Sequence, residues 1–238
     1  GFGSTLASFI SISGGASVGI YGPLVHFGAT VSSFIRRQQF IPKIPHDIII
    51  GSGVAAAISA GFGAPLAGII FAHETVLRHF SMKAVAALAI SSMAANFSAT
   101  EIGIVSPPLL LTAIPFDMGD IIISLGIIGP LAAIVAILFM KLVLFTGTIP
   151  VKINIKNWQA PVIAGFACGI CGMIFSEVLG LGTDVLMSVI TNELLFGYLL
   201  ALLLGKLILT SICVGFGFFG GLFSPALFLG GVLGALVF

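Results

Sequence analysis

Charged residues are scarce in this sequence of 238 residues. Nine are Lys or Arg and eight are Asp or Glu, so charged side chains make up only 7% of the chain, whereas 58% of it is hydrophobic. A soluble domain carries about a quarter of its residues as charges. The formal net charge of +1 supplies no basic surface for nucleic acid. The composition therefore excludes a soluble enzyme, a nucleic-acid-binding protein and a disulfide-rich secreted domain.

The few charges are also bunched, and long uncharged stretches separate them. A run of about 20 apolar residues matches the hydrocarbon core of a bilayer, which is roughly 30 Å thick. The sequence therefore predicts an all-α polytopic membrane protein. Because it begins and ends within apolar segments, we expect it to be an internal piece of a longer membrane protein. The uncharged stretches lie before Arg36, between Asp47 and Glu74, between Asp120 and Lys141, between Lys156 and Glu177, and after Lys206.

The sign of the charges predicts an orientation, because cytoplasmic loops carry an excess of Lys and Arg. Residues 101–120 form an acidic loop, which we expect to be external. Segment 84–100 then crosses outward, segment 121–140 returns, and segment 157–176 crosses outward again. The basic loops hold Arg36, Arg37 and Lys43, then Arg78 and Lys83, then Lys141, Lys152 and Lys156; the acidic loops hold Glu101, Asp117 and Asp120, then Glu177, Asp184 and Glu193.

Residues 48–73 do not fit a simple crossing. They are uncharged, yet basic loops flank them on both sides, which places both ends on the same face of the membrane. A helix rises about 1.5 Å per residue, so this segment is too short to cross roughly 30 Å twice. Residues 61–65 (GFGAP) form a strong break in its middle. The segment therefore predicts a re-entrant hairpin of two half-helices, a device typical of channels and transporters.

Two glycine-rich stretches interrupt other apolar runs in a similar way. They are residues 14–23 (GGASVGIYGP) and residues 215–225 (GFGFFGGLFSP). Both end in Pro, which suits the first turn of a helix. Each stretch therefore predicts a loop that leads into a helix N-terminus within the membrane, where the helix dipole and backbone N–H groups favour an anion. Two such breaks suggest equivalent helix ends from two halves at a shared site, whereas a single break is more often a packing feature.

Only three cysteines occur in the chain. Cys168 and Cys171 form a C-x-x-C pattern inside an apolar run, without a second pair or a nearby His. A structural metal site needs more ligands than this. The pattern therefore favours two small residues in helix packing over a redox or metal site.

Three motifs in these stretches resemble the CLC family of chloride channels and chloride/proton exchangers. Residues 19–29 (GIYGPLVHFGA) resemble the family's G-[RK]-E-G-P-x-V-H-x-G-A, and residues 63–74 (GAPLAGIIFAHE) resemble N-A-P-x-A-G-x-x-F-x-x-E. Lys206, followed by residues 215–231, is similar to the K-x8-G-S-G-x2-G-G-x-F-x-P signature. The three motifs occur in the family's order and spacing.

The resemblance implies the CLC inverted-repeat architecture, with broken and re-entrant helices, for residues 1–238 as a single, partial transmembrane domain. It implies a homodimer in a lipid bilayer with one pore per subunit, in the bacterial inner membrane. No cofactor, metal or nucleic acid is implied, and chloride or a similar small anion is the transported ligand. By motif position, the anion contacts are the backbone N–H groups of Ile20, Tyr21, Gly22, Leu222 and Phe223.

The departures from the family pattern concern its acidic residues. The gating Glu of the first motif is replaced by Tyr21, and the inner proton-transfer acid falls at Thr75. A phenol has a pKa near 10 and a threonine hydroxyl does not ionise in this range, so neither exchanges protons near neutral pH. We therefore predict uncoupled, channel-like anion transport. The alternatives are an antiporter with an unusual proton route through Glu74, next to Thr75, and a transport-inactive structural paralogue.

A membrane enzyme is the alternative from another functional class. Residues 15–19 (GASVG) satisfy G-x-S-x-G around Ser17, and His26 follows. A nucleophile elbow requires a preceding strand and an orienting acid, and no acidic residue occurs before Asp47. We therefore expect no enzymatic activity. Lys206 lies in an apolar run, so it either extends to the membrane surface or pairs with a backbone carbonyl.

Overall fold

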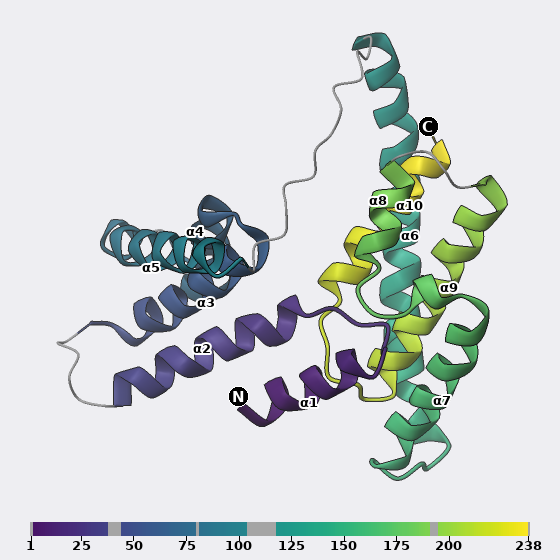
Figure 1. The fold of residues 1–238 in the computed structure, drawn as a ribbon, viewed down its shortest axis with the longest axis horizontal. Helices are drawn as coiled ribbons and strands as arrows, with labels where there is room; N and C mark the ends of the chain where they lie inside the picture. Colours follow the sequence, from purple (N-terminus) through teal and green to yellow (C-terminus); the bar gives the residue numbers. More distant parts are fainter. Residues whose placement is uncertain (1, 38–43, 80, 104–117, 191–194, 238) are drawn as a thin grey trace. The chain divides into compact units, whose positions relative to one another are not determined.

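The computed structural model describes residues 2–37, 44–79, 81–103, 118–190 and 195–237 (Figure 1). Every named element within these ranges is a helix, which confirms the predicted all-α class. The chain divides into two compact units. The first unit comprises Gly1–Leu6 and Tyr21–Leu109, and the second comprises Ala7–Ile20 and Leu110–Phe238. The single-domain organisation stays a prediction.

The first unit is built around helix α3, which packs against α2, α4, α5 and the turn η1 (Figure 1). Its interior is lined by small and branched apolar side chains, among them Val54, Ala55 and Leu88, all almost fully buried. The elements of this unit are α2 (Tyr21–Arg37), α3 (His46–Phe62), α4 (Pro65–Ala72), the π-helical turn η1 (His73–Leu77) and α5 (Met82–Glu101).

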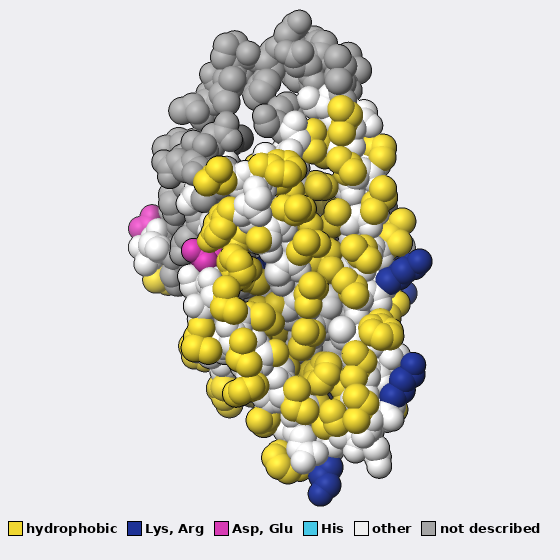
Figure 2. All heavy atoms as spheres, turned by 90° about the vertical axis from the view of Figure 1, so that its right-hand side faces the viewer, with side chains coloured by type: hydrophobic (Ala, Val, Ile, Leu, Met, Phe, Trp, Pro, Cys, Tyr) yellow, Lys and Arg dark blue, Asp and Glu magenta, His cyan; other side chains and the backbone are white. Residues whose placement is uncertain are grey.

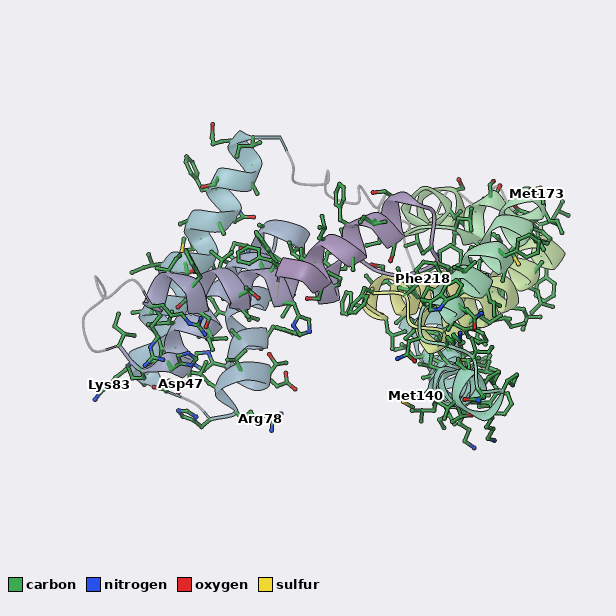
Figure 3. The ribbon with its side chains drawn as sticks, turned by 90° about the horizontal axis from the view of Figure 1, so that it is seen from below. Asp47, Arg78, Lys83, Met140, Met173 and Phe218 are labelled. Carbon is green, nitrogen blue, oxygen red and sulfur yellow. The ribbon has the colours of Figure 1, made fainter. Side chains whose placement is uncertain are left out.

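The structure confirms the predicted break in residues 48–73. Helix α3 is capped by Gly63 in the left-handed conformation (φ 64°), and Pro65 occupies the first turn of α4. Glycine adopts a positive φ without steric cost, and proline needs no partner for an N–H at a helix start. Turn η1 packs back against α3, and Figure 3 shows Asp47 and Arg78 at the same end of this unit. The two half-helices therefore form a hairpin.

Helices α2 and α3 approach each other closely at two glycines. A Cβ atom added to Gly28 would collide with the carbonyl oxygen of Gly53, and one added to Gly53 would collide with the Ser32 hydroxyl. Small residues allow this kind of contact between membrane helices, where dispersion forces rather than the hydrophobic effect hold the helices together.

In the second unit, helix α9 packs against α6, α7 and α10. Its buried side includes Leu202, Leu207 and Lys206. Helix α1 (Phe2–Ser13) has residues in both units. The other elements of the second unit are α6 (Met118–Lys152), α7 (Gln159–Ile174), the 3₁₀ turn η2 (Ser176–Val178), α8 (Thr183–Ile190), α9 (Phe196–Gly215) and α10 (Phe223–Val237).

The prediction that residue 141 begins a loop was wrong. Helix α6 continues through Lys141 and ends at Lys152, with Pro130 and Pro150 inside it. Residues 142–149 are largely apolar and contain no proline, so nothing in this stretch ends the helix. The span Ser124–Lys152 has 29 residues and extends roughly 44 Å as an ideal helix. It therefore exceeds the roughly 30 Å of the hydrocarbon core.

Three described helices are long and apolar enough to cross a membrane: α5, the Ser124–Lys152 part of α6, and α9. Apolar side chains also cover the outside of the second unit, for example Phe166 and Met173 on α7. Figure 2 shows a face of that unit dominated by hydrophobic side chains, with Lys and Arg side chains at its margin. These features identify a membrane protein. Most of the predicted external loop 101–120, and Glu193 of the second acidic loop, lie outside the described residues.

Candidate anion site

The two glycine-rich loops meet through a pair of glycines in the second unit. The N–H of Gly19 donates to the carbonyl of Gly221 at 2.7 Å, and the N–H of Gly221 donates to the carbonyl of Gly19 at 2.7 Å. A Cβ on Gly19 would lie 2.7 Å from the Ser224 hydroxyl oxygen, and one on Gly220 would collide with Val18. We call Gly19 and Gly221 the glycine pair. The close contacts explain why glycine occupies positions 19 and 220.

The predicted anion-contact residues follow the glycine pair directly. Ile20 comes after Gly19 and Leu222 after Gly221, so the structure brings these two residues to the two sides of one pair of hydrogen bonds. Helix α10 begins at Phe223, as the sequence predicts. The N–H groups of a helix's first turn have no acceptor within their own helix. Anion binding by these residues stays a prediction.

Tyr21 and Gly22 are the first two residues of α2, in the first unit. The Tyr21 ring stacks on Phe62 at the end of α3, with ring centroids 3.8 Å apart and an angle of 14° between the planes. A side chain on Gly61 would crowd both Leu24 and the Tyr21 ring. The position predicted to be the gate thus carries an aromatic ring packed on the hairpin break, and its role as a gate stays a prediction.

Thr75 and Glu74 both lie in the π-helical turn η1. Both side chains are exposed in this chain. The Thr75 hydroxyl donates to the Phe71 carbonyl at 2.7 Å, and the N–H of Arg78 closes the turn by donating to the His73 carbonyl at 2.9 Å. The Thr75 hydroxyl therefore finds its hydrogen-bond acceptor one turn earlier in the same helical segment. The π-helical turn is a feature that sequence reasoning missed, and such turns often occur at functional sites.

Ser224 is a second residue that sequence reasoning missed. It is the second residue of α10 and is 6% exposed, and its hydroxyl has no hydrogen-bond partner among the described residues. The hydroxyl oxygen lies against Gly19 of the glycine pair. A buried polar group without a partner is costly. The only sequence signal for it is a hydroxyl residue at a variable position of the third motif.

A buried polar cluster lies behind the first glycine-rich loop. The Lys206 ammonium group donates to the carbonyls of Val178 at 3.0 Å and Gly180 at 2.7 Å. The Ser17 hydroxyl also donates to the Val178 carbonyl, at 2.9 Å, and lies 3.0 Å from the Thr210 hydroxyl. We call these five residues the Lys206 cluster. Lys206 is fully buried, so it pairs with carbonyls instead of extending to the membrane surface.

The Lys206 cluster also bears on the hydrolase alternative. Ser17 is fully buried, and its hydroxyl bonds to a backbone carbonyl and to Thr210 rather than to an imidazole or a carboxylate. The described residues before Ser17 form helix α1 and a turn, not a strand. The context of a nucleophile elbow is thus missing around Ser17.

The C-x-x-C pattern does not form one site. Cys171 is exposed, whereas Cys168 is buried and faces Cys213 of α9, with the sulfur atoms 3.1 Å apart. Cys168 packs in the core of the second unit, as predicted, and Cys171 does not. Within the described ranges, no three His, Cys, Asp or Glu side chains gather in a group that holds a metal ion.

Comparison with known proteins decides the family. The model of the family described as "Voltage gated chloride channel" matches residues 1–238. The chain belongs to this family. It is 30% identical to the H(+)/Cl(-) exchange transporter ClcA of Klebsiella pneumoniae (strain 342), over 94% of the chain and 49% of that protein. It is 28% identical to the chloride channel protein CLC-e of Arabidopsis thaliana, over 98% of the chain and 35% of that protein.

Solved structures show the same fold. The crystal structure of a CLC-type fluoride/proton antiporter matches with a TM-score of 0.74 at 24% identity, over 89% of the chain and 53% of that structure. A slow cyanobacterial Cl-/H+ antiporter matches with a TM-score of 0.71 at 20% identity, over 93% of the chain and 53% of that structure. The CLC-type helical architecture is therefore confirmed. The chain spans about half the length of the bacterial ClcA relative.

Proposed function

We propose that the protein containing this chain moves chloride or a similar small anion across a lipid bilayer without coupling the movement to protons. The observation that carries the anion site is the glycine pair, which joins two glycine-rich loops where each leads into a helix N-terminus. Backbone N–H groups and helix dipoles stabilise a desolvated anion without a full countercharge. An anion held in this way binds and is still able to leave, which conduction requires.

We assign the anion contacts to the backbone N–H groups of Ile20, Tyr21, Gly22, Leu222 and Phe223. The Ser224 hydroxyl lies against Gly19, the residue before Ile20, and is a donor of the type that an anion site uses. Anomalous scattering from bromide in crystals of the complete protein would locate the ion. Density next to these amides is the expected result, and density elsewhere would remove the assignment.

The proposal of uncoupled transport is supported by the two residues at the family's acid positions. Coupled exchange needs a group that alternates between protonated and charged forms near the working pH. Tyr21 and Thr75 do not meet this requirement, and the stacking of Tyr21 on Phe62 favours a bulky barrier over a moving gate. We further propose a homodimer in a bacterial inner membrane, in line with the CLC family.

A chloride/proton exchanger is the second candidate. Two observations favour it: the Klebsiella relative is an H(+)/Cl(-) exchange transporter by name, and Glu74 is an exposed carboxylate in the π-helical turn, beside Thr75. In this mechanism water connects Glu74 to the anion pathway. The transport-inactive paralogue is the third possibility, and it predicts that no anion moves.

Chloride efflux from liposomes tests the proposal. The complete protein, wild type and Tyr21→Ala, is reconstituted into chloride-loaded vesicles, and efflux is started with a potassium ionophore while chloride and proton electrodes record both ions. We expect chloride efflux without proton movement, and severalfold faster efflux for Tyr21→Ala because a barrier has been removed. Absence of efflux from both proteins would reject transport. Proton uptake that scales with chloride efflux would favour the exchanger.

A further inference from the structure

Two buried thiols face each other in the second unit. Cys168 on α7 is 5% exposed and Cys213 near the end of α9 is fully buried. Their sulfur atoms lie 3.1 Å apart. Cys171, one turn further along α7, is exposed. The sequence gives no hint of this pair, because 45 residues separate Cys168 from Cys213.

The distance between the sulfur atoms is short for two thiols that merely pack. A disulfide bond measures about 2.05 Å, so the atoms need to move only about 1 Å closer to reach it. Helices α7 and α9 are already in contact, and each places its cysteine in the shared core. Both cysteines are free, and the pair is preorganised for oxidation.

The surroundings of the two thiols also favour exchange chemistry. Lys206 lies two turns before Cys213 on the same helix, and both are buried residues of α9. The nucleophile in disulfide formation is the thiolate, and a nearby cation stabilises that anion.

We propose that Cys168 and Cys213 form a redox modification site, which a small membrane-permeant hydroperoxide converts to a disulfide. One thiolate attacks the peroxide O–O bond and becomes a sulfenic acid, and hydroxide or alkoxide leaves. The second thiol attacks the sulfenic sulfur, the S–S bond forms and water leaves. Two thiols are thus oxidised by two electrons in total, and the peroxide is reduced to water, or to an alcohol and water.

The disulfide acts on the segments that form the glycine pair. The Cys213 carbonyl accepts the N–H of Phe218 at 2.9 Å, so it anchors the loop that leads from α9 to Gly221; Figure 3 labels Phe218 in this region. On the other side, Ser17 precedes Gly19 by two residues. Oxidation draws the sulfur atoms together and ties the last turns of α9 to α7. We therefore expect oxidation to slow anion flux, an effect that rests on the proposed function.

The test uses the complete protein in chloride-loaded liposomes. Vesicles are treated with tert-butyl hydroperoxide, remaining thiols are blocked with N-ethylmaleimide, and peptides are mapped by mass spectrometry without reduction. A parallel sample is assayed for chloride efflux before oxidation, after oxidation and after dithiothreitol. The matched variants are Cys168→Ser, Cys213→Ser and Cys171→Ser, because Cys171 lies on the same helix as Cys168 but has an exposed thiol.

We expect a linked peptide that joins Cys168 to Cys213 in the wild type and in Cys171→Ser, with a severalfold loss of efflux that dithiothreitol restores. Cys168→Ser and Cys213→Ser should show neither change. The proposal would be overturned if oxidised wild type yields no linked peptide, or if the linked peptide forms and chloride efflux does not change. The peptide map of the wild type shows whether the disulfide forms even if a variant fails to fold. If reduced wild type shows no chloride efflux, both the proposed function and the proposed effect of oxidation on anion flux are rejected. The peptide map would still show whether the Cys168–Cys213 disulfide forms.

Discussion

The two units stabilise their buried polar groups by different means. In the first unit the groups involved are neutral hydroxyls: Ser59 donates to the Ser92 carbonyl, Ser92 to the Pro65 carbonyl and Ser91 to the Ser52 carbonyl, each at 2.7 Å. In the second unit the central donor is the ammonium group of Lys206, which is fully buried and binds two carbonyls.

The difference follows from the irregular backbone that each unit contains. The break between α3 and α4 is short, with Gly63 and Ala64 between the two helices, so few carbonyls lose their helical partners. The carbonyls that the serine hydroxyls reach belong to residues within helices. The second unit instead contains longer irregular stretches before α2 and after α7. Non-helical backbone at membrane depth is tolerated only where its polar groups find partners, and a cation with three donors serves two carbonyls at once.

The largest loss of stability should come from removing the Lys206 ammonium group. Lys206→Met leaves the Gly180 carbonyl without its described partner, while the Val178 carbonyl keeps Ser17. Loss of charge-assisted hydrogen bonds from a buried group should destabilise the protein by about 3 kcal/mol. Thermal unfolding in detergent measures this as a lower Tm than wild type. Lys141→Met, at an exposed position of α6, is the control, and equal Tm values for both variants would refute the structural role.

A smaller loss of stability is expected from a substitution that disturbs the close packing of helices α2 and α3 in the first unit. Gly53→Ala places a Cβ against the Ser32 hydroxyl and the Gly28 carbonyl, so α2 and α3 must separate. Overpacking of this kind should cost about 2 kcal/mol. Gly129→Ala is the control, because a Cβ there has open space around it. A Tm for Gly53→Ala at or above that of the control would show that the two helices do not meet as described.

A smaller effect is expected from one neutral hydroxyl. Ser92→Ala removes the hydrogen bond to the Pro65 carbonyl at the start of α4, which should cost about 1 kcal/mol. Ser98→Ala on the same helix is the matched control, because its exposed hydroxyl bonds only to the Ala94 carbonyl one turn away. The comparison between the units predicts that the Tm falls less for Ser92→Ala than for Lys206→Met; the reverse order would contradict it.

The smallest effect concerns Glu177 in turn η2. Its own backbone N–H, the Tyr198 hydroxyl and the Ser176 hydroxyl hold the pKa of this carboxyl below its ordinary value. A lowered pKa in the folded state stabilises the protein above the unfolded-state pKa, and the stabilisation is lost as the pH falls through the folded-state pKa. The Tm difference between wild type and Glu177→Gln should therefore be small and positive at neutral pH and vanish in acid. A difference that grows on acidification would have the wrong sign.

Long-range contacts mark the limit of what the sequence predicts. The spacing of charges and the GFGAP break predicted the hairpin, because helix length and glycine or proline chemistry are local properties. The charge of Lys141 does not mark the start of a loop, because an apolar helix accommodates a single exposed lysine, and α6 continues to Lys152. The partners of Lys206, the Cys168–Cys213 contact and the lack of a partner for Ser224 among the described residues depend on segments distant in sequence, and no local pattern predicts them.

The reversal potential of the complete protein in a planar bilayer tests the central claim of uncoupled anion transport most directly. The measurement uses a fixed chloride gradient, with and without a gradient of one pH unit, on wild type and on Tyr21→Glu. With Tyr21 and Thr75 at the two acid positions, the potential should equal the chloride Nernst potential in both conditions, and Tyr21→Glu alone should not change this. A reproducible shift of the wild-type potential with the pH gradient would show that protons move with the anion and would contradict the account.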